Sequence, residues 1–221
     1  MIIDTHVHES KYSFDSQLDL QEGIKYAKQI GLDGLCITNH ENNNLRNEIG
    51  DSVIIDGILV VVGAEILTKQ GDILVFGLKD IPMDMLDASE LLSLVRKHQG
   101  AAIAAHPYRN NQRGLENHLY EVARLLDGVE SFNGSTYTFH NLYAYATATQ
   151  LGLPSSGGSD AHNIERLGKY ATKFYGNIRD HKDFIEAIKG KDFHPVMRKE
   201  GYFQDFDYTY QDILSGQKFK R

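Results

Sequence analysis

The sequence predicts an α/β fold in which about seven strand–helix units form one domain. Short runs rich in β-branched residues alternate with segments whose apolar residues recur at helical spacing, and glycine follows most of the helical segments. The 221 residues, 41% hydrophobic and 24% charged, have an ordinary globular composition and suffice for one large core. The alternation is typical of a parallel sheet or barrel, so we treat residues 1–221 as a single domain.

The expected elements follow this alternation from the N-terminus. A first strand begins at Ile2, and Ser16 with Asp19 resembles a capping box that opens a helix ended by Gly31. Further strands are expected over residues 34–38, 58–67, 72–78, 101–105 and 129–132, from 153, over 170–175 and near 193, with a hairpin turn at Gly71. Further helices are expected from 87 to 100, with Asp87 and Glu90 at the start, and over 119–126, 141–151 and 181–189.

Charge and cysteine content narrow the class of protein. The chain carries 23 Lys and Arg against 30 Asp and Glu, a net charge of −7, which argues against a protein that coats nucleic acid or a membrane surface. The single cysteine, Cys36, cannot form an intramolecular disulfide. No signal peptide is evident after Met1, and the longest apolar run, residues 58–64, is too short to span a bilayer. We therefore expect a cytoplasmic protein.

Metal-ligand residue types gather where the expected strands end. They are Asp4, His6, His8, His40, Glu65, His106, Glu130, Asn133, Asp160 and His162. In a barrel of parallel strands these ends open onto one face, where active sites are built. His6 and His8 point the same way in a strand, and Glu65 follows an uncharged run, so its buried carboxylate needs a partner. Together these residues predict a metal site.

Each residue by itself also has a structural explanation. His106 precedes a proline and could simply occupy a turn, and Asp160 with His162 follows two glycines, which is common turn chemistry. The remaining histidines are interpreted as surface or packing residues, and Cys36 as a core residue. The sequence contains no G-x-S-x-G, P-loop or G-x-G-x-x-G motif, so serine hydrolase, P-loop kinase and Rossmann oxidoreductase have no support.

The order of the motifs resembles the polymerase-and-histidinol-phosphatase (PHP) superfamily, and more closely its small stand-alone phosphoesterases. The motifs are Asp4-x-His6-x-His8, Thr38-Asn39-His40, Gly63-x-Glu65, Ala105-His106-Pro107 followed by Tyr108-Arg109, Gly128-x-Glu130 and Gly158-Ser159-Asp160-x-His162. The resemblance runs from Asp4 to about residue 175. It implies a distorted (β/α)7, TIM-like barrel with a cluster of about two or three divalent metal ions.

The resemblance also implies which residues bind the ions. The first site would use His6, His8, Glu65 and Asp160; the second would share Glu65 and add His106; the third would use His40, His162 and Asp15. Asp72 stands where the family usually has a histidine ligand, and it is retained as a ligand of the second site. The residues expected to orient these ligands are Asp4, Asn39, Glu130 and Asn133, with Asn39 replacing the family's usual aspartate beside His40.

This ligand set suits hydrolysis of a phosphate ester. Imidazole and carboxylate ligands favour zinc, manganese or iron. A carboxylate shared by two ions places them roughly 3.5–4 Å apart, where they can bind a bridging water, lower its pKa and deliver hydroxide to a phosphoryl group. Glu65, His106 and Asp160 are the expected catalytic residues closest to that water. Arg109 is the candidate for binding the substrate phosphate, with Lys11 and Arg166 as weaker candidates.

The leading function is a metal-dependent phosphomonoesterase (EC 3.1) for a small anionic phosphorylated metabolite such as a sugar phosphate, a nucleotide or histidinol phosphate. A phosphodiesterase or exonuclease on short oligonucleotides is the alternative, although no basic stretch supplies the groove it needs. A metal-dependent amidohydrolase and a degenerate metal-binding module, supported only by Asn39 and Asp72, stay open. We expect no stable nucleic-acid or membrane partner, and the oligomeric state is open.

The C-terminal segment, about residues 200–221, is aromatic and carries no metal-type cluster. Its aromatic residues include Tyr202, Phe203, Phe206, Tyr208 and Tyr210. We expect this tail to pack on the outside of the barrel, with a dimer contact as the alternative.

Overall fold

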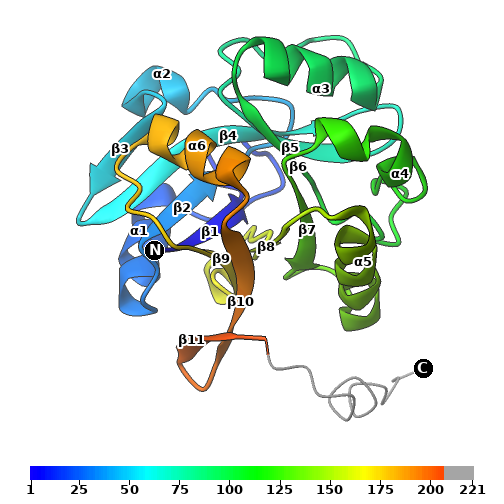
Figure 1. Ribbon diagram of the computed structural model, residues 1–221. Coiled ribbons are helices and arrows are strands. Elements are labelled where there is room, and N and C mark those ends of the chain that lie inside the picture. The colour runs from blue at the N-terminus through cyan, green and yellow to red at the C-terminus, as the bar shows by residue number, and fades with distance from the viewer. Residues whose placement is uncertain (207–221) are drawn as a thin grey trace.

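The computed structural model describes residues 1–206, which form one mixed α/β domain around a curled sheet (Figure 1). The strands are β1 (Ile2–Val7), β2 (Gly34–Ile37), β3 (Ser52–Ile55), β4 (Ile58–Leu67), β5 (Asp72–Phe76), β6 (Ala101–Ala104), β7 (Gly128–Asn133), β8 (Ser155–Gly158), β9 (Tyr170–Phe174), β10 (Phe193–Lys199) and β11 (Tyr202–Asp205). The α-helices are α1 (Leu20–Gln29), α2 (Arg46–Ile49), α3 (Ala88–Lys97), α4 (His118–Val122), α5 (Thr138–Leu151) and α6 (His181–Gly190). Two 3₁₀ turns are η1 (Ala123–Leu125) and η2 (Ile164–Arg166).

The sheet mixes parallel and antiparallel strand pairs and is not a regular alternation of strands and helices. Its order is β11-β10-β9-β1-β2-β4-β5-β6-β7-β8, with β3 paired to β4. Strands β5 and β9 run antiparallel to their neighbours, because β5 returns from β4 in a hairpin and β9 pairs antiparallel with both β1 and β10. The predicted α/β single domain is confirmed, whereas the pairing does not reproduce the strict (β/α)7 pattern.

The sheet curls until β8 approaches β1. Val7 and Ala161 form an isolated parallel bridge there, and the His8 N–H donates to the Ala161 carbonyl at 3.0 Å. Between the named strands described here, no continuous ladder joins β8 to β1, so the sheet is a curled half-barrel within residues 1–206. This curl brings the ends of β1 and β8 together, and both carry metal-type residues.

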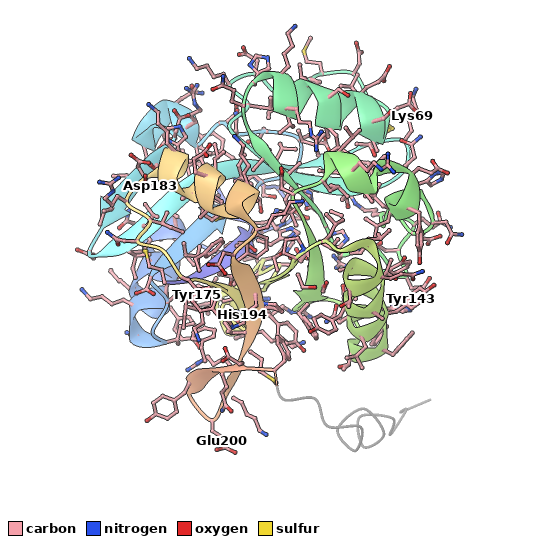
Figure 2. All side chains as sticks on the ribbon, in the orientation of Figure 1. Lys69, Tyr143, Tyr175, Asp183, His194 and Glu200 are labelled. Carbon is pink, nitrogen blue, oxygen red and sulfur yellow. The ribbon has the colours of Figure 1, made fainter. Side chains whose placement is uncertain are left out.

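Helices cover the outside of the curl, and α6 closes the inner core at one end. Ile24 and Ala27 of α1 pack in a cluster with β1, β2 and β4, while α3, α4 and α5 contribute to a second cluster along β5 to β7 (Figure 1). Phe184 of α6 joins Phe76 and Phe174 in a third cluster. Charged side chains such as Lys69 and Glu200 lie at the periphery (Figure 2). Among the described residues, no helix is long and apolar enough to cross a membrane.

Locally encoded elements agree best with the sequence-based expectations. The strand at residues 58–67 and the hairpin over Gly71 are confirmed, and the Asp87 N–H donates to the Glu90 carboxylate at 3.0 Å in the expected capping arrangement of α3. The expectation that Ser16 caps α1 is wrong. Asp19 is the N-cap and accepts from the Glu22 N–H, because the Ser16 hydroxyl donates instead to the His8 carbonyl at 2.7 Å. Sequence reasoning missed α2, β3 and β11.

The described part of the aromatic C-terminal segment lies against the domain. Tyr202 and Phe203 belong to β11, which pairs antiparallel with β10. The ring centroid of Phe206 lies 3.9 Å from that of Phe132 on β7. Tyr208 and Tyr210 of the expected tail lie outside the described residues.

Candidate metal centre

The metal-type residues converge at one end of the sheet. His8 follows β1, His40 follows β2, His106 follows β6 and Asp160 follows β8, because these strands run in one direction and finish at the same edge. Asp72 begins β5, yet it reaches the same end because β5 runs antiparallel to β4. The metal-type residues that the sequence predicts at the ends of strands therefore lie close to one another.

An irregularity in β1 turns its histidines toward the centre. The pairing of β1 with β2 shifts register between Asp4 and Val7. Ile3 lies in the inner core with α6, but Val7 lies in the cluster under α1, although a regular strand would put both on one face. The shift therefore aims His6 and His8 into the curl, where both are fully buried.

The first group of ligand atoms has the spacing of a metal site. His6 Nε2 and His8 Nε2 lie 3.0 Å apart, and Glu65 Oε2 lies 3.4 and 3.3 Å from them. Asp160 Oδ1 lies 3.6 and 3.3 Å from the same nitrogens. Atoms about 2.0–2.2 Å from one tetrahedral ion lie about 3.3–3.6 Å apart. Glu65 Oε2 is buried and lies 2.9 Å from His40 Nδ1, and neither of these two atoms makes a hydrogen bond, so the residues fit a divalent cation.

The second oxygen of Glu65 faces a different group. Glu65 Oε1 lies 2.8 Å from His106 Nε2, and Asp72 Oδ2 lies 3.8 Å from the same nitrogen. The Asp72 carboxylate also accepts from Arg113 Nε at 2.7 Å and from Nη2 at 2.9 Å. Glu65 is thus placed to bridge two ions, whereas Asp72 has a cationic partner that the sequence did not indicate.

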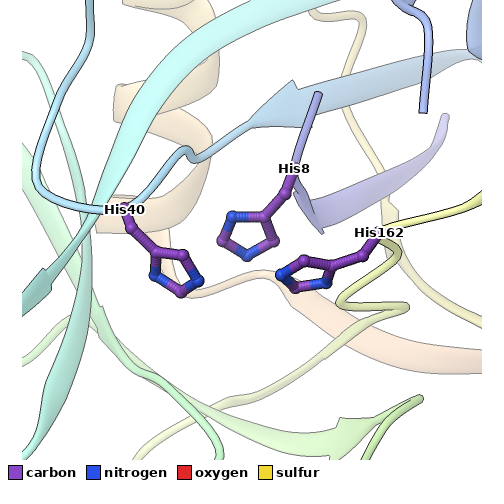
Figure 3. A group of neighbouring side chains, drawn as sticks. All are labelled: His8, His40 and His162. Atoms are coloured by element: carbon purple, nitrogen blue, oxygen red, sulfur yellow. The ribbon is translucent and has the colours of Figure 1, made fainter. Parts of the chain in front are cut away.

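A third group lies at the more open side of the centre. The imidazoles of His8, His40 and His162 face one another (Figure 3), with ring centroids of His40 and His162 at 4.3 and 4.2 Å from that of His8. Asp15 Oδ2 lies 3.2 Å from His40 Nε2 and 3.1 Å from His162 Nε2. Asp15, which the resemblance implied as the acidic ligand of this group, therefore lies beside both histidines.

Buried polar groups hold the ligands from behind. Glu130 Oε1 pairs with His6 Nδ1 at 3.0 Å, which leaves His6 Nε2 facing the first group. The Asn133 amide donates to Glu130 at 3.0 Å and to Asp160 Oδ2 at 3.3 Å. Asp4 accepts from the Ser159 N–H at 2.8 Å and so holds the backbone just before Asp160. These four contacts are the kind expected of Asp4, Glu130 and Asn133.

The Asn39 side chain bonds to Glu9 rather than orienting the His40 ring, contrary to expectation. Its amide donates to Glu9 Oε1 at 2.7 Å, and its oxygen accepts from the Glu9 N–H at 3.0 Å. The Glu9 carboxylate also accepts from the Lys11 N–H at 2.7 Å. Sequence reasoning missed Glu9, whose one signal was its position directly after His8. Asn39 therefore fixes Glu9 and the loop that leads to Asp15.

The buried charges of the centre shift the pKa values of its carboxylates in different directions. Burial raises the pKa of Glu65, but His6 and the neighbouring imidazoles lower it by more, so the net pKa is well below its usual range. Burial lowers the pKa of His6, but Glu130 and the other carboxylates raise it by more. Burial raises the pKa of Asp4 to about 6. Cations, whether protons on imidazole or metal ions, are thus stabilised among these carboxylates.

The three candidate phosphate-binding residues occupy different places. Arg109 Nη1 donates to Asp160 Oδ2 at 2.6 Å, which puts its guanidinium at the centre. Arg166 Nη1 donates to the Ser135 hydroxyl at 3.0 Å, and that hydroxyl donates to the Asp160 carbonyl at 3.2 Å. Lys11 is exposed, and its ammonium pairs with Glu48 at 2.6 Å. As candidates for binding the substrate phosphate, the contacts favour Arg109 over Arg166, and Arg166 over Lys11.

A curled α/β sheet with an imidazole–carboxylate cluster at its strand ends defines a class of metal-binding proteins. Residues 138–192 match the family model described as PHP-associated. The chain is 33% identical over 146 residues to the uncharacterized protein MJ1587 of Methanocaldococcus jannaschii. The matched region covers 60% of this chain and 82% of that protein. The chain belongs to the PHP superfamily, as the motif order indicated.

Solved structures share the fold at low sequence identity. PsfC from Pseudomonas syringae superposes with a TM-score of 0.72 at 19% identity, covering 97% of this chain and 95% of that one. A two-domain protein of Bacteroides vulgatus, containing a predicted PHP-like metal-dependent phosphoesterase, gives 0.64 at 18%, covering 98% and 68%. The lesion-specific endonuclease PfuEndoQ from Pyrococcus furiosus gives 0.61 at 16%, covering 97% and 65%.

Proposed function

We propose that the protein is a metal-dependent phosphoesterase that hydrolyses small phosphomonoesters in the cytoplasm. The observation that carries the proposal is Glu65, because its two oxygens face two separate groups of ligand atoms. The residues that would hold the ions are His6, His8, Glu65 and Asp160, then Glu65 with His106 and Asp72, then His40, His162 and Asp15. Such ions, when bound, activate water and neutralise charge on phosphoryl oxygens.

The protein's own groups explain how a substrate is positioned. His6, Glu65 and Asp160 are almost fully buried, so they are held rigidly and away from competing water. Asp15 and His162 are 35% and 26% exposed, so a substrate enters from their side. Arg109 bonds to Asp160 and is partly exposed, and its planar guanidinium can donate two parallel hydrogen bonds to a phosphate.

A nuclease is the second candidate function, and a pocket beside the centre favours it. Arg166 and Lys169 line a pocket of about 400 Å³ together with Ser135, whose hydroxyl contacts the Asp160 carbonyl. Two cations beside the centre could hold the next phosphate of an oligonucleotide. The lesion-specific endonuclease PfuEndoQ shares the fold, which makes this reaction worth testing.

Metal analysis and substrate comparison test both proposals. Protein purified without chelator should contain about two or three divalent ions of zinc, manganese or iron per chain. It should hydrolyse an aryl phosphate more rapidly with added manganese and lose activity after chelation. Faster cleavage of short oligonucleotides than of any monoester would favour the nuclease. If reconstituted protein binds no metal, the metal-dependent mechanism is wrong.

A further inference from the structure

A separate pocket opens directly from the metal centre. Its volume is about 360 Å³, within the range of small-molecule sites, and Asp15 and His40 line it as well as belonging to the third ligand group. Phe14 comes from the loop between β1 and α1, and Met83 from the loop between β5 and α3. A molecule held at the centre would therefore extend between these two loops.

The outer walls of this pocket are apolar side chains left in water. Phe14 is 97% exposed, Met83 is 102% exposed and Met85 is 54% exposed. Large apolar groups give up the stabilisation of burial when they stay solvated, and grouped exposure of this kind marks binding surfaces. An aromatic ring and two adaptable thioethers suit a flat apolar ligand.

The charges that face the pocket disfavour a second anionic group. Glu41 and Asp84 line it together with Asp15. The opposing cation, Arg113, is neutralised by a two-pronged pair with the buried Asp72 carboxylate. A phosphate at the centre would be held by cations, but any further anion on the same molecule would meet an acidic rim.

We propose that this pocket binds the leaving group of the phosphomonoester and selects an apolar, preferably aromatic alcohol without negative charge. This inference rests on the proposed phosphomonoesterase function and narrows its substrate class. Water adds its oxygen to phosphorus, the bond from phosphorus to the alcohol oxygen breaks, and a proton from that water passes to the alcohol. Phe14 and Met83 contact the alcohol's apolar part, and Asp84 contributes the repulsion of anions.

Three alkyl phosphates with similar leaving oxygens test this selection. We expect kcat/KM to fall from 2-phenylethyl phosphate to ethyl phosphate and again to 2-carboxyethyl phosphate. Phe14→Ala and Met83→Ala should each lower kcat/KM for the phenylethyl ester about tenfold, the size of an apolar-pocket contact, and leave ethyl phosphate nearly unchanged. Asp84→Lys should improve the carboxyethyl ester. Ile54→Ala is the matched control. Ile54 is likewise an exposed apolar side chain, but it lies on β3 opposite Leu59, which is six residues before Glu65 on β4.

Binding of stable phosphonates separates this inference from the proposed function. By calorimetry, 3-phenylpropylphosphonate should bind more tightly than propylphosphonate, and Phe14→Ala should remove the difference. If no ester is hydrolysed but this preference holds, the phosphomonoesterase proposal fails and the subsite stands. If the three esters are hydrolysed with equal kcat/KM, the subsite proposal is wrong. It is also wrong if Phe14→Ala leaves the difference in phosphonate affinity unchanged.

Discussion

The pair between Asp72 and Arg113 can be tested by a double-mutant cycle. Asp72 is fully buried and receives two hydrogen bonds from Arg113, at 2.7 and 2.9 Å. Its Oδ2 also lies 3.8 Å from His106 Nε2, within reach of the second ligand group. The substitutions are Arg113→Met, which keeps the stem and removes the charge, and Asp72→Asn, which keeps the shape of the carboxylate.

The expected energy follows from the burial of the two partners. Breaking a fully buried pair costs about 3–5 kcal/mol, whereas exposed pairs contribute about 0–1 kcal/mol. Arg113 is 36% exposed, so we expect Arg113→Met to cost about 1–3 kcal/mol in chelator-treated protein. A loss of about 2 kcal/mol lowers Tm by about 4–8 °C in a chain of this size.

The Asp72→Asn background isolates the pair. Burial and the charge of Glu65 raise the pKa of Asp72 despite Arg113, so neutralising it alone should cost little. Arg113→Met should then add almost no further loss, because the charge it would leave unpaired is gone. Thermal melts of the four proteins measure the coupling. Equal losses from Arg113→Met in both backgrounds would refute it.

Metal titration of the same variants asks whether Asp72 is also a ligand. If it binds the second ion, Asp72→Asn should lower metal content. Arg113→Met should raise affinity, because it frees both carboxylate oxygens. Unchanged metal content in Asp72→Asn would leave Asp72 as a structural partner of Arg113 alone.

Three further predictions follow from single contacts. Glu65→Gln should lose metal and phosphatase activity together while the chain stays folded, because both oxygens face ligand groups; wild-type turnover in a folded variant would exclude the bridging role. Arg109→Ala should lower kcat/KM for phosphate esters by about 1.5–3 kcal/mol, roughly ten- to a hundredfold, with metal content unchanged, and Arg109→Lys should recover part; unchanged kcat/KM would place the phosphate contact elsewhere. Burial raises the pKa of Asp127, so this carboxyl destabilises the native state increasingly as pH rises from its ordinary pKa of 3.8 to the raised value. Asp127→Asn, which can still accept from the Ala102 N–H, should therefore raise Tm slightly at pH 7, and the gain should vanish below pH 3.8. A Tm difference independent of pH would contradict this.

Part of the candidate site could be predicted from the sequence, because its candidate ligands follow the ends of strands. Hydrophobic runs predict where β1, β2 and β4 end, and parallel strands finish at a common edge. The sequence therefore predicts that His6, His40 and Glu65 lie close together. The resemblance put Asp72 among the candidate ligands, and the hairpin that reverses β5 brings its Oδ2 to 3.8 Å from His106 Nε2. The motif order then identified the family.

Other features of the site depend on contacts between distant residues. Arg113 meets Asp72 across 41 positions, and Asn39 meets Glu9 across 30, so no local pattern encodes either pair. The register shift in β1 and the pocket between Phe14 and Met83 likewise depend on how β1 pairs and where two loops meet.

The sequence by itself determined the α/β class, most strand and helix positions and the metal-type residues, because hydrophobic periodicity, caps and turns act within a few residues. Only the tertiary structure decided which oxygen of Glu65 faces which histidine, which partner Asp72 takes and where the apolar pocket opens. Those outcomes depend on the curl of the sheet, which brings β8 back to β1 and sets distances between side chains more than a hundred residues apart.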